Sequence, residues 1–191
     1  MVREATLTPY SRWAKPLVSE VAEVINLLKD NGYDSNQLFS VTGIQQKNIN
    51  AWTARYKNEP ENVSTIPYPC WCFLCALAGE PNIQSDGEVI EVNVRRVLSY
   101  FKPTAFRPND KFVCPTSEQF SNLIDNDNYE ALTTEKLSAV FNWNANNFAR
   151  GIANGSLPFL NWSLIVMSMG IDIQKMILKE LQGPVSLDEC D

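Results

Sequence analysis

Ser35-Asn-Gln-Leu-Phe-Ser-Val-Thr-Gly-Ile44 begins the stretch that determines the fold of this 191-residue chain. A polar run, Gln45–Asn50, follows it, then Trp52 and, after a loop, Ile66-Pro-Tyr-Pro-Cys-Trp71. Gly43 suits a tight turn because glycine adopts left-handed backbone angles without steric cost. The stretch therefore predicts a helix-turn-helix with a Trp-bearing helix packed behind it.

The residues before this stretch predict a first helix. Its apolar residues recur at three- and four-residue steps, which gives it one apolar face: Leu17, Val21, Val24, Ile25 and Leu28. Gly32 suits the left-handed residue that follows a helix. We expect the Ser35 hydroxyl to cap the second helix, which runs to about Val41, by accepting a free backbone N–H.

Two more helices are predicted after the turn. The third runs from Gln46 to about Tyr56, with Ile49 and Trp52 facing inward. The fourth begins near Pro67, because proline is favoured at the start of a helix, and ends at Gly79. The residues around Pro60 form the loop between them.

The chain matches itself at an offset of 99 residues. The matched pairs are prolines or large apolar residues: Pro9 with Pro108, Trp13 with Phe112, Pro16 with Pro115, Val21 with Phe120, Leu38 with Leu137, Ile44 with Trp143 and Ile49 with Phe148. Eight extra residues in the first copy then lower the offset to 91. At that offset the pairs are Pro67 with Pro158, Trp71 with Trp162, Leu74 with Ile165 and Gly79 with Gly170. Because these positions set turns and fill cores, the pattern predicts an all-α protein built by tandem duplication.

The repeat predicts two helix-turn-helix-like domains, residues 1–85 and 106–191, joined by a connector at 86–105. Alternating apolar residues in 87–101 fit a strand and a helix equally well, and the helical surroundings favour a helix. In the second domain the predicted signals are a Thr116–Gln119 capping box, a helix over 120–124, a Thr134 cap, a turn at Asn142 and a last helix over 173–181.

Composition excludes several classes of function. No apolar run reaches the roughly 20 residues that cross a bilayer, and no apolar leader follows the N-terminus, so we expect a cytoplasmic protein without membrane contact. The chain has no histidine, which removes most hydrolase constellations. We expect no enzyme and no cofactor. Residues two apart on a helix point in nearly opposite directions, so the sulfurs of Cys70, Cys72 and Cys75 cannot converge on a metal, and these residues are expected to be buried thiols.

Gly43-Ile44, the polar third helix, Trp52 and Ile66-Pro-Tyr with Trp71 together resemble the Cro and phage-repressor-like (XRE) helix-turn-helix family of prophages and conjugative elements. The resemblance covers residues 9–80 and, more weakly, 108–171. It implies a DNA-binding transcriptional regulator of a phage or mobile element whose third helix enters the major groove of double-stranded DNA.

Carried over position by position, the resemblance assigns base contacts to Gln45, Gln46, Lys47 and Asn50 and phosphate contacts to Arg55 and Lys57. The side chains suit these roles, because Gln and Asn pair with adenine and Lys reaches guanine or phosphate. A solvated helix face is the alternative for the same residues. Two linked units could imitate a repressor dimer, and pairing of two chains into a homodimer is a further possibility.

Charge separates the two units. Residues 1–85 hold seven Lys and Arg against eight Asp and Glu, whereas residues 106–191 hold six against eleven. Since phosphate neutralisation supplies most non-specific affinity for DNA, the second unit is expected to be a poor DNA binder.

The acidic second unit also suggests a second function, protein binding. An anti-CRISPR-like inhibitor would use it to block the basic nucleic-acid channel of a host protein complex. The carboxylates assigned to this role are Asp125, Asp127, Glu130 and Glu135.

Overall fold

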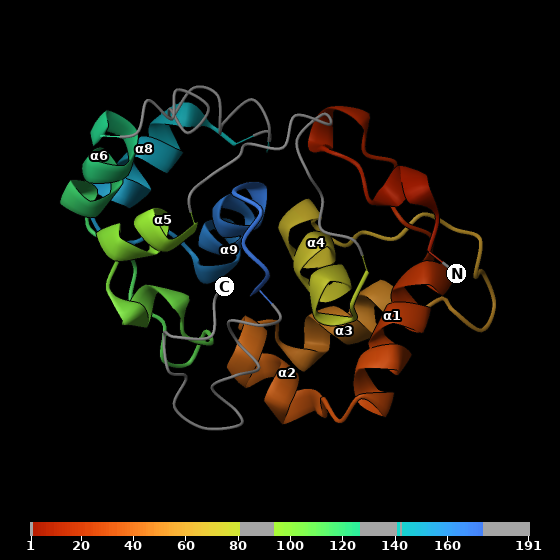
Figure 1. The fold of residues 1–191 in the computed structure, drawn as a ribbon. Coiled ribbons are helices and arrows are strands. Elements are labelled where there is room, and N and C mark those ends of the chain that lie inside the picture. The colour runs from red at the N-terminus through yellow and green to blue at the C-terminus, as the bar shows by residue number, and fades with distance from the viewer. Residues whose placement is uncertain (1, 81–93, 127–140, 142, 174–191) are drawn as a thin grey trace.

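The computed structural model describes residues 2–80, 94–126, 141 and 143–173. Every regular element in that part of the chain is a helix, which confirms the predicted all-α class (Figure 1). None of the described helices is long and apolar enough to cross a membrane. Residues 2–80 are called the first half below and residues 94–173 the second half.

The first half contains four α-helices after two short 3-10 turns at Glu4–Thr6 and Tyr10–Arg12. The helices are α1 (Val18–Asp30), α2 (Ser35–Thr42), α3 (Gln46–Thr53) and α4 (Tyr68–Leu77). The second half contains α5 (Val94–Tyr100), a 3-10 turn (Pro103–Phe106), α6 (Ser117–Asn126), α8 (Ala145–Ala153) and α9 (Phe159–Ser168). The helical interpretation of the connector is confirmed for α5. Thr134, the turn at Asn142 and most of the helix predicted over 173–181 lie outside the described residues.

Two details at the ends of the helices differ from the prediction. The cap of α2 is Asp34 and not Ser35: the Asp34 carboxylate accepts hydrogen bonds from the backbone N–H groups of Asn36 and Gln37, at 2.8 and 2.9 Å. Asp34 is one residue earlier, so Ser35 becomes the first helical residue. The third helix ends at Thr53 and not near Tyr56, and a turn follows it.

Other predicted helix ends are confirmed. Gly32 and Gly43 follow α1 and α2 with left-handed backbone angles, φ +91° and +73°. In the second half the Thr116 hydroxyl accepts a hydrogen bond from the backbone N–H of Gln119, and the Gln119 amide oxygen accepts one from the Thr116 N–H. This reciprocal pair is the predicted capping box before α6.

Each half contains an internal hydrogen bond, and the two bonds lie at corresponding positions. The Trp71 indole N–H donates to the Thr6 carbonyl at 2.8 Å, and the Trp162 indole N–H donates to the Ala105 carbonyl at 2.6 Å. Thr6 and Ala105 are 99 residues apart, and the two tryptophans are 91 apart, which are the two offsets of the sequence repeat. In the first half this bond connects the segment before α1 to α4. In the second half it connects the 3-10 turn before α6 to α9.

The backbone follows the same correspondence. The Ala14 N–H donates to the Ala5 carbonyl at 2.9 Å, and the Val113 N–H donates to the Thr104 carbonyl at 3.1 Å, again 99 residues further on. Gly79 and Gly170 both have left-handed angles after α4 and α9, with φ +83° and +75°.

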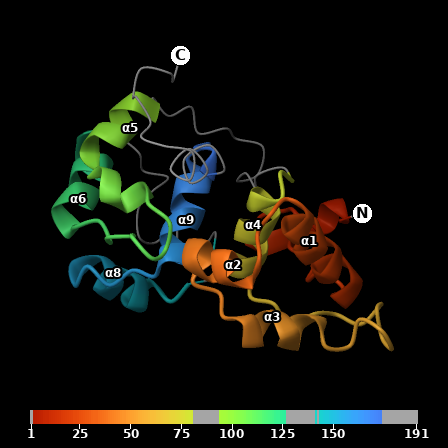
Figure 2. The same ribbon diagram turned by 90° about the horizontal axis from the view of Figure 1, so that it is seen from below.

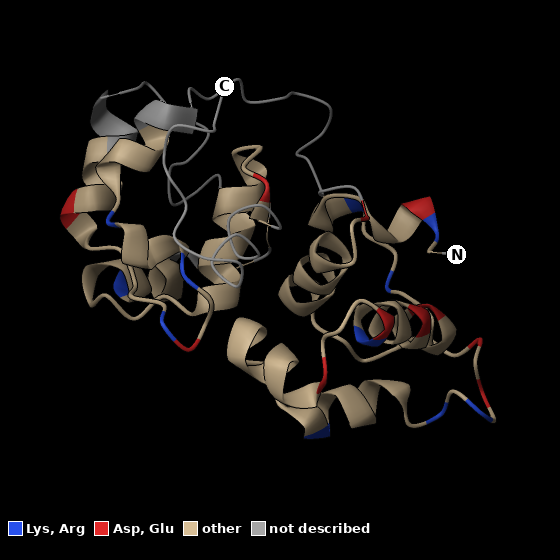
Figure 3. Cartoon of the chain, turned by 60° about the horizontal axis from the view of Figure 1, so that its bottom comes forward, with Lys and Arg blue, Asp and Glu red and all other residues tan. Residues whose placement is uncertain are grey.

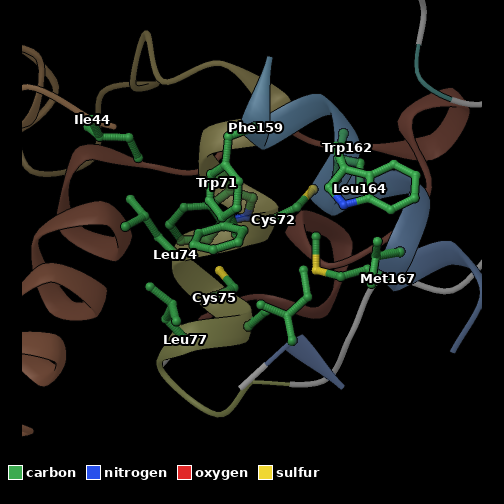
Figure 4. Close-up of a cluster of buried hydrophobic side chains, with 14 of the residues drawn as sticks. Ile44, Trp71, Cys72, Leu74, Cys75, Leu77, Phe159, Trp162, Leu164 and Met167 are labelled. Atoms are coloured by element: carbon green, nitrogen blue, oxygen red, sulfur yellow. The ribbon is translucent and has the colours of Figure 1, made fainter. Parts of the chain in front are cut away.

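Helices α4 and α9 lie next to each other between the two halves (Figure 1). Both are apolar on nearly all sides, which suits helices that are covered from every direction. The rings of Phe73 and Phe159 meet edge to face at 5.3 Å between centroids. Leu74, Cys75, Leu164 and Met167 add to the same cluster (Figure 4). One hydrophobic core therefore extends through both halves.

Candidate nucleic-acid interface

Helix α3 lies at the surface, with one face packed on α1. Ile49 and Trp52 are buried on that face, 3% and 7% exposed, as predicted. The opposite face is open to solvent, and no described residue of the second half covers it (Figure 2). The turn at Gly43 and the two buried anchors therefore fix how α3 presents its outer side chains.

The structure brings the four predicted base-contacting residues together at the start of α3. Gln45 is the capping residue of the helix and is exposed, as are Lys47 and Asn50. Gln46 is half-buried, and its amide N–H donates to the Asn50 side-chain oxygen at 2.7 Å. This bond holds the two amide side chains side by side at the surface of α3.

Arg55 and Lys57, assigned to phosphates, lie in the turn after α3 and not on the helix. Both are exposed, and the Arg55 guanidinium forms an ion pair with Glu59 at 3.3 Å. Along the described chain, the positions of Lys and Arg are interspersed with those of Asp and Glu (Figure 3). The exposed Arg55–Glu59 ion pair is worth at most about 1 kcal/mol, so a phosphate can replace Glu59 as the partner of Arg55 at little cost.

The second half completes the turn before α3, a feature that the sequence did not predict. The backbone N–H groups of Asn109 and Asp110 donate to the carbonyls of Val41 and Ser40, at 3.1 and 3.0 Å. The Ser40 hydroxyl donates to the Asp110 carboxylate at 2.6 Å. These bonds satisfy carbonyls that the end of α2 leaves free. The orientation of the turn therefore depends on both halves.

Helix α8 occupies in the second half the place that α3 occupies in the first. Its capping residue, Asn144, accepts a hydrogen bond from the Asn147 N–H at 3.1 Å, and Phe148 is buried beneath it. An open groove of about 510 Å³ runs between α8 and the start of α9. Both polar and apolar residues line it: Asn144, Asn147, Arg150, Asn154, Ser156 and Asn161, with Trp143, Phe148, Gly151, Leu157 and Pro158.

The carboxylates assigned to protein binding cannot be placed. Asp127, Glu130 and Glu135 lie outside the described residues, as does the side chain of Asp125 at the end of α6. That hypothesis stays a prediction.

Two of the three cysteines of α4 are buried, as expected, and Cys70 is half-buried. Cys72 and Cys75 are 2% and 1% exposed, and burial raises the pKa of both thiols. Burial also raises the pKa of Cys70, to about 12. Such thiols are protonated and unreactive at neutral pH. Within the described part of the chain no group of side chains has the composition of a metal site.

One curated protein is similar to this chain over part of its length. It is the transcriptional repressor protein KorC of Escherichia coli, 28% identical over 78 residues, which is 41% of this chain and 84% of the repressor. The matched stretch is about as long as one of the two predicted domains. No family model and no solved structure matches the chain.

Proposed function

We propose that the chain is a non-enzymatic DNA-binding transcriptional regulator, in which α2, the Gly43 turn and α3 form the reading element. The observation that carries the proposal is the geometry of α3. Its apolar side is anchored by Ile49 and Trp52, and its other side presents Lys47 and Asn50 to solvent without cover. A helix mounted in this way can enter the major groove, which is wide enough to admit it.

The similarity to a transcriptional repressor supports the same class of function. The proposal includes a Cro-like helix-turn-helix, a duplicated chain with domains at 1–85 and 106–191, and a cytoplasmic protein of a phage or mobile element. The hydrogen bonds shared at offsets of 99 and 91 residues support the duplication. The mobile-element setting rests on the family resemblance alone.

Each proposed contact has its own role. The hydrogen-bonded pair of Gln46 and Asn50 reads a base, because an amide offers one donor and one acceptor to adenine. Lys47 reaches guanine or a phosphate. Arg55 and Lys57 hold the adjacent backbone, which fixes the position of the helix without reading sequence.

The proposal is tested by selecting binding sites from random DNA duplexes with the full chain and measuring affinity for the selected site. We expect Lys47→Ala to weaken binding and to lower the slope of log affinity against log salt by about 1. Asn50→Ala should cost about 1–3 kcal/mol and relax the preference at one base pair.

Lys29→Ala is the matched control, because Lys29 is an exposed lysine at the end of α1 and has no proposed contact. It should leave affinity nearly unchanged. Failure to enrich any duplex, or equal losses in the Lys47 and Lys29 variants, would contradict the proposal. Recovery of a stoichiometric host protein complex in place of DNA would favour the inhibitor hypothesis.

A further inference from the structure

The acidic residues of the second half are absent from α8 and its groove. The sequence between Glu135 and Asp172 contains no Asp or Glu. The charged residues in this interval are Lys136 and Arg150. All the residues that line the groove fall within this interval. The net negative charge of residues 106–191 therefore says little about this surface.

One residue that lines the groove differs in kind from its counterpart in the first half. Gly151 stands 99 residues after Trp52, so a glycine occupies the place of the tryptophan that anchors α3. A Cβ at Gly151 would lie 3.7 Å from the Leu157 backbone, an ordinary van der Waals distance, so Leu157 packs directly against the glycine. Gly151 and Leu157 both line the groove, and no side chain of indole size projects into it from position 151.

The side chains that face this space suit the edges of bases. Asn144, Asn147 and Arg150 are exposed on α8, and Asn154 is exposed just after it. An asparagine amide can pair with adenine, and an arginine guanidinium pairs with guanine or phosphate. Helices α3 and α8 lie along the same side of the molecule, the lower side in Figure 2.

We propose that the α8 groove is a second DNA-contacting surface, so that a single chain binds two unlike half-sites on one duplex. The inference rests on the proposed function of α3 and extends it. At the half-site under α3, Lys47, Arg55 and Lys57 hold the DNA, and the helix also reads its bases. The half-site under α8 is read mainly by neutral asparagines, with Arg150 as its cation, so it contributes more to specificity than to salt-dependent affinity.

The experiment uses the full chain and the duplex selected above. Three results are expected: a site with two blocks of base preference, one chain bound per duplex, and protection of both blocks in a footprint. Arg150→Ala should weaken binding about tenfold and lower the salt slope by about 1. Asn147→Ala should relax base preference in the second block only.

A charge reversal gives a sharper comparison. Asn147→Asp places a carboxylate near the start of α8, where it favours the helix but repels phosphate, so it should lose at least tenfold in affinity while the protein stays folded. Asn26→Asp, on the exposed side of α1, is the matched control and should bind as the parent does. Circular dichroism verifies the fold of each variant.

Two results would overturn the inference while leaving the function of α3 intact. One is a selected site with a single block that Lys47→Ala weakens and the α8 variants do not. The other is two chains per duplex, each protecting one block through α3. If no duplex is selected at all, the proposed function fails as well.

Discussion

Glu20 is a buried carboxylate in α1, 4% exposed, and its environment keeps it ionised. Burial raises its pKa, but hydrogen bonds from the Arg3 side chain, from the backbone N–H of Leu17 and from the backbone N–H of Arg3 outweigh burial, so the pKa falls below its ordinary value of 4.5. The Arg3 guanidinium donates to both carboxylate oxygens at 2.9 Å, and the Leu17 N–H donates at 2.6 Å. This one side chain thus fastens the N-terminal segment to the start of α1.

Replacing Glu20 by Gln should lower the free energy of unfolding at pH 7 by about 2 kcal/mol, because hydrogen bonds to a charged group are lost. The folded pKa is lowered, so the ionised carboxylate stabilises the fold fully above the ordinary pKa of 4.5, and this contribution is lost as pH falls through the folded value. The deficit of the variant should therefore shrink below about pH 4. Urea titrations at several pH values measure it.

Glu4→Gln is the control for Glu20, since Glu4 is exposed. Its effect should stay within about 0.5 kcal/mol at every pH. A deficit for Glu20→Gln that stays constant from pH 7 to pH 3 would show that the carboxylate charge has no part in it.

Gly43 combines two requirements at one residue. Its φ of +73° is unfavourable for any residue with a Cβ, and a Cβ there would lie 2.8 Å from the Asn109 side-chain oxygen. The tight turn explains the first requirement and was predicted. The second arises because the second half packs on the turn, and nothing in the local sequence indicates that contact.

At the scale of elements, the sequence predicted the helices well because their signals are local. The apolar face of α1, the glycines after α1 and α2 and the Thr116–Gln119 box depend on residues a few positions apart. The error at the cap of α2 arose because two local signals compete: Asp34 and Ser35 can both cap the helix, and the Asp34 carboxylate accepts two N–H groups.

The candidate site was predicted in part. The spacing of Ile49 and Trp52 indicated which side of α3 is outward, and Gln45, Lys47 and Asn50 are exposed there. The groove on α8 was missed, although Gly151 in the register of Trp52 was a readable signal. The net charge of the whole second unit concealed the α8 groove, because DNA binding depends on the charge at the contact surface and not on the summed charge of the unit.

The fourth helices of the two halves should respond alike to the same substitution. Trp71→Phe and Trp162→Phe each remove a buried indole N–H that donates to a carbonyl. Each should lower the free energy of unfolding by about 2–3 kcal/mol, from a lost hydrogen bond of about 1 kcal/mol and a smaller side chain in the core. Urea denaturation measures both.

Trp13→Phe is the control for the indole hydrogen bond. The Trp13 indole N–H is buried without a hydrogen-bond partner among the described residues, so its removal also removes a cost of desolvation. This variant should lose less stability than the other two. A large loss in one fourth-helix variant and none in the other would contradict their equivalence.

At the scale of the molecule, the packing of α4 on α9 gives the two halves one core. Phe73 is fully buried, and the Phe159 ring that it meets also contacts Phe112, with both pairs at 5.3 Å. The polar contacts of Ser40 and Val41 with the Asp110 segment add a second connection. Neither half can unfold without exposing the apolar side of the other.

We therefore expect the chain to unfold in a single transition, with equal calorimetric and van't Hoff enthalpies. Phe73→Ala should cost about 3–5 kcal/mol and should raise amide hydrogen exchange in α9 as much as in α4, although the substitution lies in the first half. Tyr56→Ala, at an exposed residue beyond α3, should change neither. Two separate transitions, or faster exchange confined to residues 2–80, would mean that the halves are independent domains. Independent domains would not fix the position of α3 relative to α8. A shared core keeps both helices on one side of a rigid body, and binding two half-sites on one duplex requires that arrangement.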